Sequence, residues 1–258
     1  IIARAPHGSR TRHAALVAAV AISLGMLGFF KYFVFAQNNL NALVVWFGGT
    51  PFPVLQVGLP VGISFFVFQS LSYSIDVYRG ESPPVRSLAD FACFVALFPQ
   101  LIAGPIVRYK TVAVELKERK FDLSAFGYGI YRFCIGLGKK ILIANTMAGI
   151  CRIYGELPEK TTLITWVYAV SFSLQIYFDF SGYSDMAIGL GKLFGFSFPE
   201  NFQYPYIAKS ATEFWRRWHM TLGVWFRDYV YIPMGGNRVS GLRYVLNILV
   251  VWFLTGLW

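Results

Sequence analysis

The chain has 258 residues, of which 56% are hydrophobic, 18% are aromatic and 14% are charged. Soluble domains carry about 25% charged residues, so this composition excludes an ordinary soluble domain and predicts an all-α integral membrane protein. The formal net charge is +10, but the basic residues gather in short segments between apolar runs, as in membrane proteins that follow the positive-inside rule. We therefore expect a lipid bilayer as partner and no nucleic acid.

Domain organisation follows from the absence of a polar linker, which favours one domain over residues 1–258. The chain begins Ile1-Ile2 and ends at Trp258 within an apolar run, so we expect this domain to be partial and truncated at both ends. Its three cysteines are isolated in or beside apolar segments, which predicts buried reduced thiols and neither a disulfide framework nor a metal site.

The first third of the chain alternates between polar and apolar segments. Apolar runs of about 20 residues are long enough to cross the hydrocarbon of a bilayer, and uncharged loops favour the outer side. The expected elements are a cytoplasmic loop at 1–13, a span at 14–36, an external loop at 37–51, a span at 52–75 kinked at Pro60 and Gly62, and an internal loop at 76–90.

Residues 91–107 form a short apolar run that is interrupted by Pro99, Gly104 and Pro105. Charged segments flank it, and the basic residues of the following segment reach Lys120. Two interpretations are open. The run either re-enters the membrane and returns to the same side, which requires surrounding protein or a water-filled cavity, or it forms a short span.

A span at 124–150 contains Lys139 and Lys140, and after an external loop the chain returns through a span at 162–180. Asp179 and Asp185 follow in an apolar context, where a carboxylate is costly and is usually paired. The possible partners are Lys139, Lys140, Arg216 and Arg217. Adjacent lysines point in different directions on a helix, so only one can face a given site. Ser181-Gly182 is expected to break the helix, and Ser184 or Asp185 to cap the next one.

The stretch from Ser210 to Trp225 begins with a capping box, in which Ser210 and Glu213 each bond a backbone N–H. At helical spacing Trp215, His219, Leu222 and Phe226 share one face. An interfacial anchor is the plain interpretation of such a basic, tryptophan-rich helix. On that interpretation the histidine is only a hydrogen-bonded side chain, although an imidazole among aromatic rings and beside Arg216 is unusual in a membrane protein.

After that stretch, Gly235-Gly236 beside Arg238 is either a tight turn or a weak phosphate-binding loop. Residues 242–258 are expected to start the last span.

A series of motifs runs in order through residues 55–258. They are Pro60-Val-Gly-Ile-Ser-Phe, Ile75-Asp-Val-Tyr-Arg-Gly, Phe98-Pro-Gln-Leu-Ile-Ala-Gly-Pro, Gln175-Ile-Tyr-Phe-Asp-Phe-Ser-Gly-Tyr-Ser-Asp-Met-Ala-Ile-Gly-Leu-Gly, Glu200-Asn-Phe, Pro205-Tyr-Ile, Glu213-Phe-Trp-Arg-Arg-Trp-His, Arg227-Asp-Tyr and Gly235-Gly-Asn-Arg. This series resembles the membrane-bound O-acyltransferase (MBOAT) family, and most closely its bacterial alginate O-acetyltransferase branch.

The resemblance implies a multi-span helical bundle of the MBOAT type, with re-entrant or interfacial helices and a central funnel, in the cytoplasmic (inner) membrane of a bacterium. It implies transfer of an acetyl group from cytoplasmic acetyl-CoA towards hydroxyls of an exported polysaccharide such as alginate. No bound cofactor is expected. A periplasmic or other extracytoplasmic protein is expected to carry the acetyl group onward.

By the same resemblance His219 matches one functional histidine of the family and is the candidate catalytic residue. The family's principal catalytic histidine would directly follow Trp258, so the chain as given is expected to be inactive. The basic side chains could bind donor phosphates, and the two aspartates would hold positive side chains in place. The candidate substrate-binding residues are Arg216, Arg217, Arg227, Arg238, Asp179, Asp185, Trp215 and Trp218.

Alternatives remain open from the sequence. Within acyl transfer, these are D-alanyl transfer to teichoic acid or acetylation of another cell-wall glycan. A transporter or channel is the alternative of another class, because charges inside spans also occur along transport pathways. The paired repeats that many transporters show are not evident.

Overall fold

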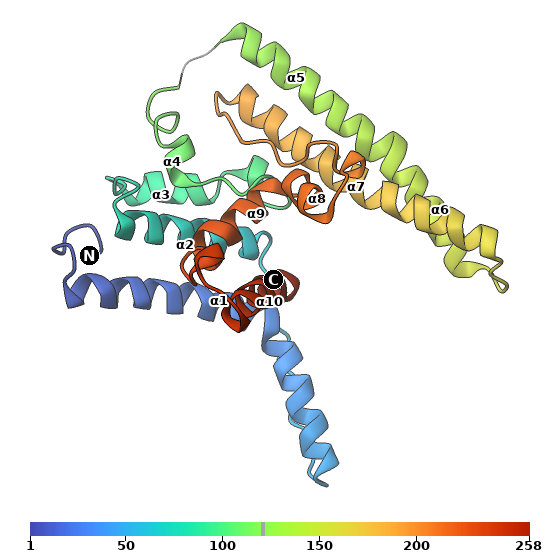
Figure 1. Ribbon diagram of the computed structural model, residues 1–258, viewed down its shortest axis with the longest axis horizontal. Helices are drawn as coiled ribbons and strands as arrows, with labels where there is room; N and C mark the ends of the chain where they lie inside the picture. Colours follow the sequence, from blue (N-terminus) through green and yellow to red (C-terminus); the bar gives the residue numbers. More distant parts are fainter. Residues whose placement is uncertain (120–121) are drawn as a thin grey trace. The chain divides into compact units, whose positions relative to one another are not determined.

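The computed structural model describes residues 1–119 and 122–258, and in those residues the chain is helical without a β-strand (Figure 1). Lys120 lies outside the described residues. Three of the helical stretches are long and apolar enough to cross a membrane, namely Arg10–Trp46, Leu123–Glu156 and Thr162–Leu193. The predicted all-α membrane fold class is therefore confirmed.

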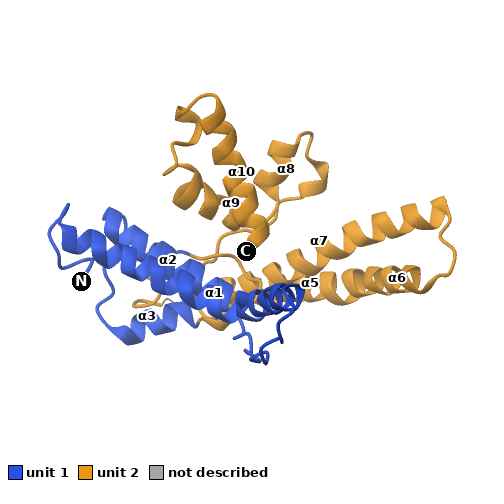
Figure 2. Ribbon diagram, turned by 90° about the horizontal axis from the view of Figure 1, so that it is seen from below, with its two compact units in different colours: residues 1–96, 108–110, 258 blue, residues 97–107, 111–257 orange. Residues whose placement is uncertain are grey.

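The chain divides into two compact units, and Figure 2 shows them in separate colours. One unit comprises residues 1–96, 108–110 and 258, and the other comprises residues 97–107 and 111–257. Each unit is described here by itself.

The first unit is built on helix α1 (Arg10–Trp46), which packs against α2 (Ile63–Arg79). Ser9 caps α1 by accepting a hydrogen bond from the backbone N–H of Arg12. The buried guanidinium of Arg12 donates to the carbonyls of Val77 and Tyr78, at 3.2 and 2.8 Å. Arg12 thus bonds two carbonyls in the last turn of α2, of which that of Val77 also accepts from the N–H of the C-cap residue Gly80.

The predicted boundaries in this unit are wrong at both helices, since α1 begins inside the loop predicted at 1–13 and α2 ends inside the loop predicted at 76–90. Helix α1 continues to Trp46, so residues 37–46 are helical and are not a loop. The predicted span at 52–75 is helical only from Ile63, after Gly62 at a φ of +76°. The proline-rich stretch from Pro51 to Pro60 accounts for this difference, because proline lacks the N–H that helix formation needs.

Helix α3 (Leu88–Val95) begins in the loop predicted at 76–90 and ends within the short apolar run, which also contains the 3₁₀ turn η1 (Phe98–Gln100). A helix of eight residues is about 12 Å long, whereas the hydrocarbon core is about 30 Å thick. No continuous helical span forms across 91–107, and re-entry of this run stays a prediction. A further helical turn, α4 (Tyr109–Val112), follows.

The second unit is built on two antiparallel helical stretches that lie side by side (Figures 1 and 2). One consists of α5 (Leu123–Gly138), the π-helical segment η2 (Lys139–Ala144) and α6 (Asn145–Glu156). The other is α7 (Thr162–Leu193). The predicted span at 124–150 is confirmed, and the span predicted at 162–180 is longer than expected.

Glycines let the backbones of α5 and α7 approach closely. A Cβ atom placed on Gly136 would lie 2.5 Å from the carbonyl oxygen of Gly182, and one on Gly129 would lie 2.8 Å from that of Gly189. Small residues at such seams are typical of helix packing in membranes. The predicted break at Ser181-Gly182 is therefore wrong: α7 continues through it, and Gly182 serves close packing. Ser184 and Asp185 lie inside α7 and cap no helix.

The C-terminal third of the second unit consists of short elements. They are η3 (Pro205–Ile207), α8 (Ala211–Arg217), α9 (Met220–Phe226), the π-helical η4 (Arg227–Tyr231), η5 (Gly236–Arg238) and α10 (Leu242–Leu257).

Candidate active site

His219 lies at a break between two helices. Helix α8 ends at Arg217, and His219 has a φ of +43° and a ψ of +53° before α9 begins at Met220. The single helix expected through this stretch is therefore wrong. Left-handed backbone is costly for a residue with a side chain, and it persists only where the surroundings enforce it. Here the 201–203 segment bonds both sides of the break: Met220 N–H donates to the Asn201 carbonyl, and Gln203 N–H donates to the Arg217 carbonyl, each at 2.9 Å.

The imidazole of His219 is 6% exposed, and its Nδ1 lies 3.0 Å from Oδ1 of Asn201. The same oxygen accepts from the backbone N–H of Thr221 at 3.3 Å and from its hydroxyl at 2.9 Å. A backbone N–H can only donate, so its bond identifies the amide oxygen of Asn201. An amide oxygen only accepts, so Nδ1 of His219 carries the proton and Nε2 carries the lone pair of the neutral ring.

The surroundings of His219 favour the neutral ring. Its centroid lies 4.8 Å from that of Phe180 and 6.4 Å from that of Phe202. His219 lies outside the three candidate spans, and burial lowers its pKa from 6.5 to about 4 because an apolar environment disfavours the charged form. The ring is therefore neutral near pH 7.

A cavity of about 370 Å³ opens beside His219. Trp215, Leu222 and Phe226, which the spacing placed on one face with His219, all line it. They meet there because the break between α8 and α9 turns both short helices toward the same space, which differs from the predicted reason. The remaining wall comes from Trp218, Gly223, Arg227, Tyr231, Val251, Trp252 and Thr255. The lining is mainly apolar.

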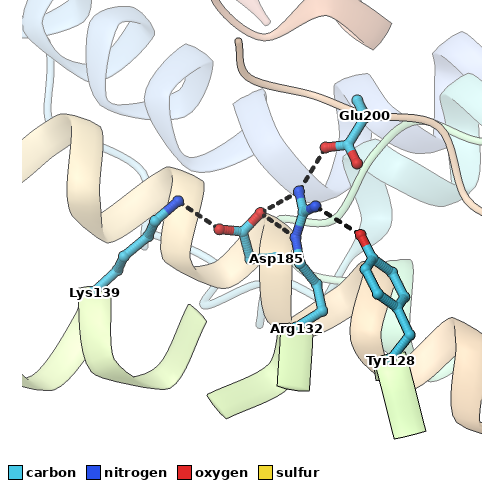
Figure 3. A network of polar contacts seen from close by, with 5 residues as sticks. All are labelled: Tyr128, Arg132, Lys139, Asp185 and Glu200. Carbon is cyan, nitrogen blue, oxygen red and sulfur yellow. Dashed lines mark hydrogen bonds and ion pairs between the residues drawn. The ribbon is translucent and has the colours of Figure 1, made fainter. Parts of the chain in front are cut away.

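A second group of polar residues connects α5 with α7, and Figure 3 shows it closely. Arg132 donates from Nε and Nη2 to Oδ1 of Asp185, at 2.9 and 2.7 Å, and also pairs with Glu200 at 2.6 Å. Lys139 donates to the other oxygen of Asp185 at 2.6 Å, and Tyr128 accepts from Arg132 at 3.0 Å. Two cations thus enclose one buried carboxylate.

These contacts confirm the predicted pairing of the intramembrane aspartates. Lys139 pairs with Asp185, and Lys140 pairs with Asp179. The two adjacent lysines reach different carboxylates, as expected from their directions on a helix. Arg216 and Arg217, the other predicted partners, make no such bond to these aspartates among the described residues.

Three residues of this region were not singled out from the sequence. Arg132 and Glu200 complete the ion network, and Asn201 contacts His219. Arg132 carries a charge inside a predicted span, which is the signal that identified Lys139. Asn201 belongs to the motif Glu200-Asn-Phe, but that motif did not indicate its contact with His219, which depends on a loop that folds back to the helix break.

The N-terminal cap of α8 is partly as predicted. Ser210 accepts from the Glu213 N–H at 3.1 Å. The Glu213 carboxylate, however, accepts from the N–H of Lys209 at 2.9 Å instead of closing the box on Ser210. Glu213 also pairs with Arg217 at 2.8 Å.

The four candidate phosphate-binding arginines occupy different settings. Arg217 bonds Glu213, whereas Arg227 lines the cavity and pairs with Asp228 at 2.7 Å. Arg216 and Arg238 are exposed. The N–H of Gly235 donates to the Ile232 carbonyl at 3.0 Å, which fits the tight turn better than a phosphate-binding loop. In the described part of the chain, no group of three or more His, Cys, Asp or Glu side chains is arranged to hold a metal ion.

Comparisons with known proteins show the family of this chain. The model of the family described as MBOAT, membrane-bound O-acyltransferase family, matches residues 63–258. The chain is 49% identical to the probable alginate O-acetylase AlgI of Azotobacter vinelandii, over 97% of this chain and 51% of that protein. It is 35% identical to the peptidoglycan O-acetyltransferase of Helicobacter pylori, over 94% and 51%, and 32% identical to the teichoic acid D-alanyltransferase of Bacillus subtilis, over 67% and 45%. The chain spans about half the length of these relatives.

Proposed function

We propose that the whole protein transfers an acetyl group to hydroxyls of an exported polysaccharide. The ground for this proposal is that the chain belongs to the membrane-bound O-acyltransferase family. The neutral, buried His219 beside an apolar cavity carries this proposal. Acyl transfer needs a base for the attacking hydroxyl, stabilisation of the oxyanion and exclusion of water.

His219 is suited to orienting a hydroxyl more than to removing its proton. A base works best when its pKa lies near the operating pH, and burial holds the pKa of His219 at about 4. A neutral ring with a lone pair on Nε2 can still accept a hydrogen bond from a hydroxyl. The principal base in this proposal is the histidine that the family resemblance places directly after Trp258.

Acetyl-CoA is the proposed donor, and it would approach from the cytoplasmic side of a bacterial inner membrane. Arg216, Arg217, Arg227 and Arg238 are the proposed contacts for its phosphates, because a guanidinium binds phosphate oxygens in pairs. Trp215 and Trp218 are proposed to wall the acyl site. Asp179 and Asp185 are proposed to act indirectly by holding the cations of α5 and η2.

Alginate is the acceptor that the relatives favour, because the proteins named alginate O-acetylase reach 49% identity and the peptidoglycan and teichoic acid enzymes reach 35% and 32%. An extracytoplasmic protein that carries the acetyl group to the polymer is part of the proposal. The transporter alternative loses support, since the charges that suggested it pair with one another.

The test uses the whole protein reconstituted in vesicles with labelled acetyl-CoA, an alginate acceptor and the extracytoplasmic carrier. Wild-type protein should move label to the acceptor side, and His219→Ala should slow this by about a hundredfold or more, as expected for loss of a catalytic contact. Transfer by His219→Ala at the wild-type rate would remove the role of His219. Efficient transfer by the 258-residue chain alone would disprove the proposed base. With peptidoglycan or teichoic acid offered beside alginate, acetyl label on one of those polymers and none on alginate would reassign the acceptor.

A further inference from the structure

We infer that Asn201 is a positioning residue: its amide oxygen holds His219 as the Nδ1–H tautomer, and the Arg132–Glu200 ion pair anchors the segment that carries it. The catalytic consequence rests on the function proposed above, whereas the tautomer itself does not.

The side-chain hydrogen bonds of Asn201 all end on one atom, its amide oxygen Oδ1. Oδ1 accepts from His219 Nδ1, from the Thr221 N–H and from the Thr221 hydroxyl. The side chain is fully buried, and its Nδ2 has no hydrogen-bond partner among the described residues. A buried amide nitrogen without a partner is unfavourable, so the side-chain contacts that favour asparagine here all run through the oxygen.

Thr221 extends this arrangement. Its hydroxyl donates to Asn201 and accepts from the backbone N–H of Ile106 at 3.0 Å. Because the amide oxygen of Asn201 has no proton to donate, the Thr221 hydroxyl gives its one proton to Asn201 and accepts the Ile106 N–H on a lone pair. The direction of each hydrogen bond up to His219 is thereby determined.

The segment that carries Asn201 is held at two points. Glu200, the preceding residue, pairs with Arg132, which also bonds the buried Asp185 (Figure 3). On the other side, the Asn201 carbonyl accepts from Met220, the residue that follows His219. The amide oxygen is therefore fixed relative to both α5 and the start of α9.

The tautomer decides what His219 offers to a hydroxyl. With the proton on Nδ1, Nε2 accepts a hydrogen bond and can orient the acceptor through a hydroxyl other than the attacking one, whose single proton goes to the base. With the proton on Nε2, the ring could only donate to that hydroxyl and would no longer accept from it. Removing the acceptor at Asn201 should free the ring to populate both tautomers.

The experiment uses the whole protein labelled with ¹⁵N-histidine, in which the signal of His219 is identified by its loss in His219→Gln. Pyrrole-type and pyridine-type nitrogens are distinguished by their NMR shifts at neutral pH. Wild-type His219 should show a pyrrole-type Nδ1. Asn201→Leu should lose this preference, and Asn201→Asp, which keeps an acceptor, should retain it.

Asn247→Leu is the matched control, because Asn247 is a second buried asparagine whose amide donates to the carbonyl of Met234, away from His219. It should leave the tautomer unchanged. In acetyl transfer, Asn201→Leu should lower kcat by about tenfold, the worth of one hydrogen bond, with little change in KM, and Asn201→Asp should recover most of it.

Two results would overturn the inference. One is a wild-type His219 with its proton on Nε2, which requires no variant to fold. The other is an Asn201→Leu protein that keeps the wild-type tautomer. If the wild-type protein transfers no acetyl group, the proposed function fails, while the NMR result still decides the tautomer.

Discussion

Asp185→Asn removes the one carboxylate that α7 places between Arg132 and Lys139. Arg132 keeps Glu200 as a partner, so the charge left without compensation is that of Lys139. Breaking a buried ion pair from one side costs about 3–5 kcal/mol. The lower end applies because the side chains of Arg132 and Lys139 keep 21% and 27% of their exposure. We expect a loss of about 3 kcal/mol in the free energy of unfolding.

The double variant Asp185→Asn/Lys139→Met tests this reasoning. Methionine keeps an unbranched chain of similar length without the charge, and Arg132 and Glu200 remain paired. We expect the double variant to recover more than half of the stability lost in the single variant. Thermal unfolding of the whole protein in detergent, followed by circular dichroism, should show a decrease of at least about 5 °C for Asp185→Asn, given about 2–4 °C per kcal/mol for domains of 150–250 residues.

Glu159→Gln is the control for loss of a carboxylate, because Glu159 is exposed in the loop between α6 and α7. Glu159→Gln should unfold at the same temperature as the wild-type protein. The reasoning is refuted if Asp185→Asn is as stable as the wild type, or if the double variant is no more stable than the single one. Either result would mean that Lys139 reaches water without cost.

Three further predictions follow from single contacts. Gly136→Ala should destabilise the protein by about 1–3 kcal/mol, because the added Cβ would lie 2.5 Å from the Gly182 carbonyl oxygen. Gly138→Ala is the control and should be neutral or stabilising, because a Cβ there would meet no neighbouring atom within 4 Å. Equal melting temperatures of the two variants would contradict this prediction. Since the pKa of His219 falls to about 4 on folding, the unfolded state binds more protons below pH 6.5. The free energy of unfolding should therefore decline by up to about 3 kcal/mol as pH falls from 6.5 to 4. His219→Gln should flatten this part of the stability profile, and an unchanged profile would exclude the pKa shift. Ser210→Ala should cost about 1 kcal/mol in chemical unfolding through loss of the α8 cap; a change near zero would show that water replaces the hydroxyl.

The long elements and the paired charges could be predicted from the sequence. A run of about 20 apolar residues has few alternatives to a membrane helix. The cost of an unpaired charge among such helices predicted that Asp179 and Asp185 are paired, with two lysines and two arginines as possible partners, and the structure selects the lysines. The grouping of His219 with Trp215 was also predicted, although a single continuous helix was the wrong reason for it.

The helix ends depended on contacts that the sequence does not display. The break at His219 is enforced by backbone hydrogen bonds to the 201–203 segment. The residues around His219 do not indicate which distant segment of the chain supplies these bonds. Glycine often breaks helices, but Gly182 lies within α7 and lets the backbone of α5 pack closely against it. Asn201 was missed because its partner is 18 residues away across a loop.

The glycine seam between α5 and α7 restricts how this region can change in length. Gly129 and Gly136 face Gly189 and Gly182, and the two glycines of each helix are seven positions apart. Arg132 and Lys139 have the same spacing of seven positions. If one helix shifted along the other, larger side chains could repack, but two backbones in direct contact have no side chain between them that could adjust. A residue inserted between Gly129 and Gly136 would therefore misalign the seam and the two cations together, whereas an insertion in the α6–α7 loop would disturb neither. Homologues of this chain should accordingly vary in the loop and keep one fixed spacing within each helix.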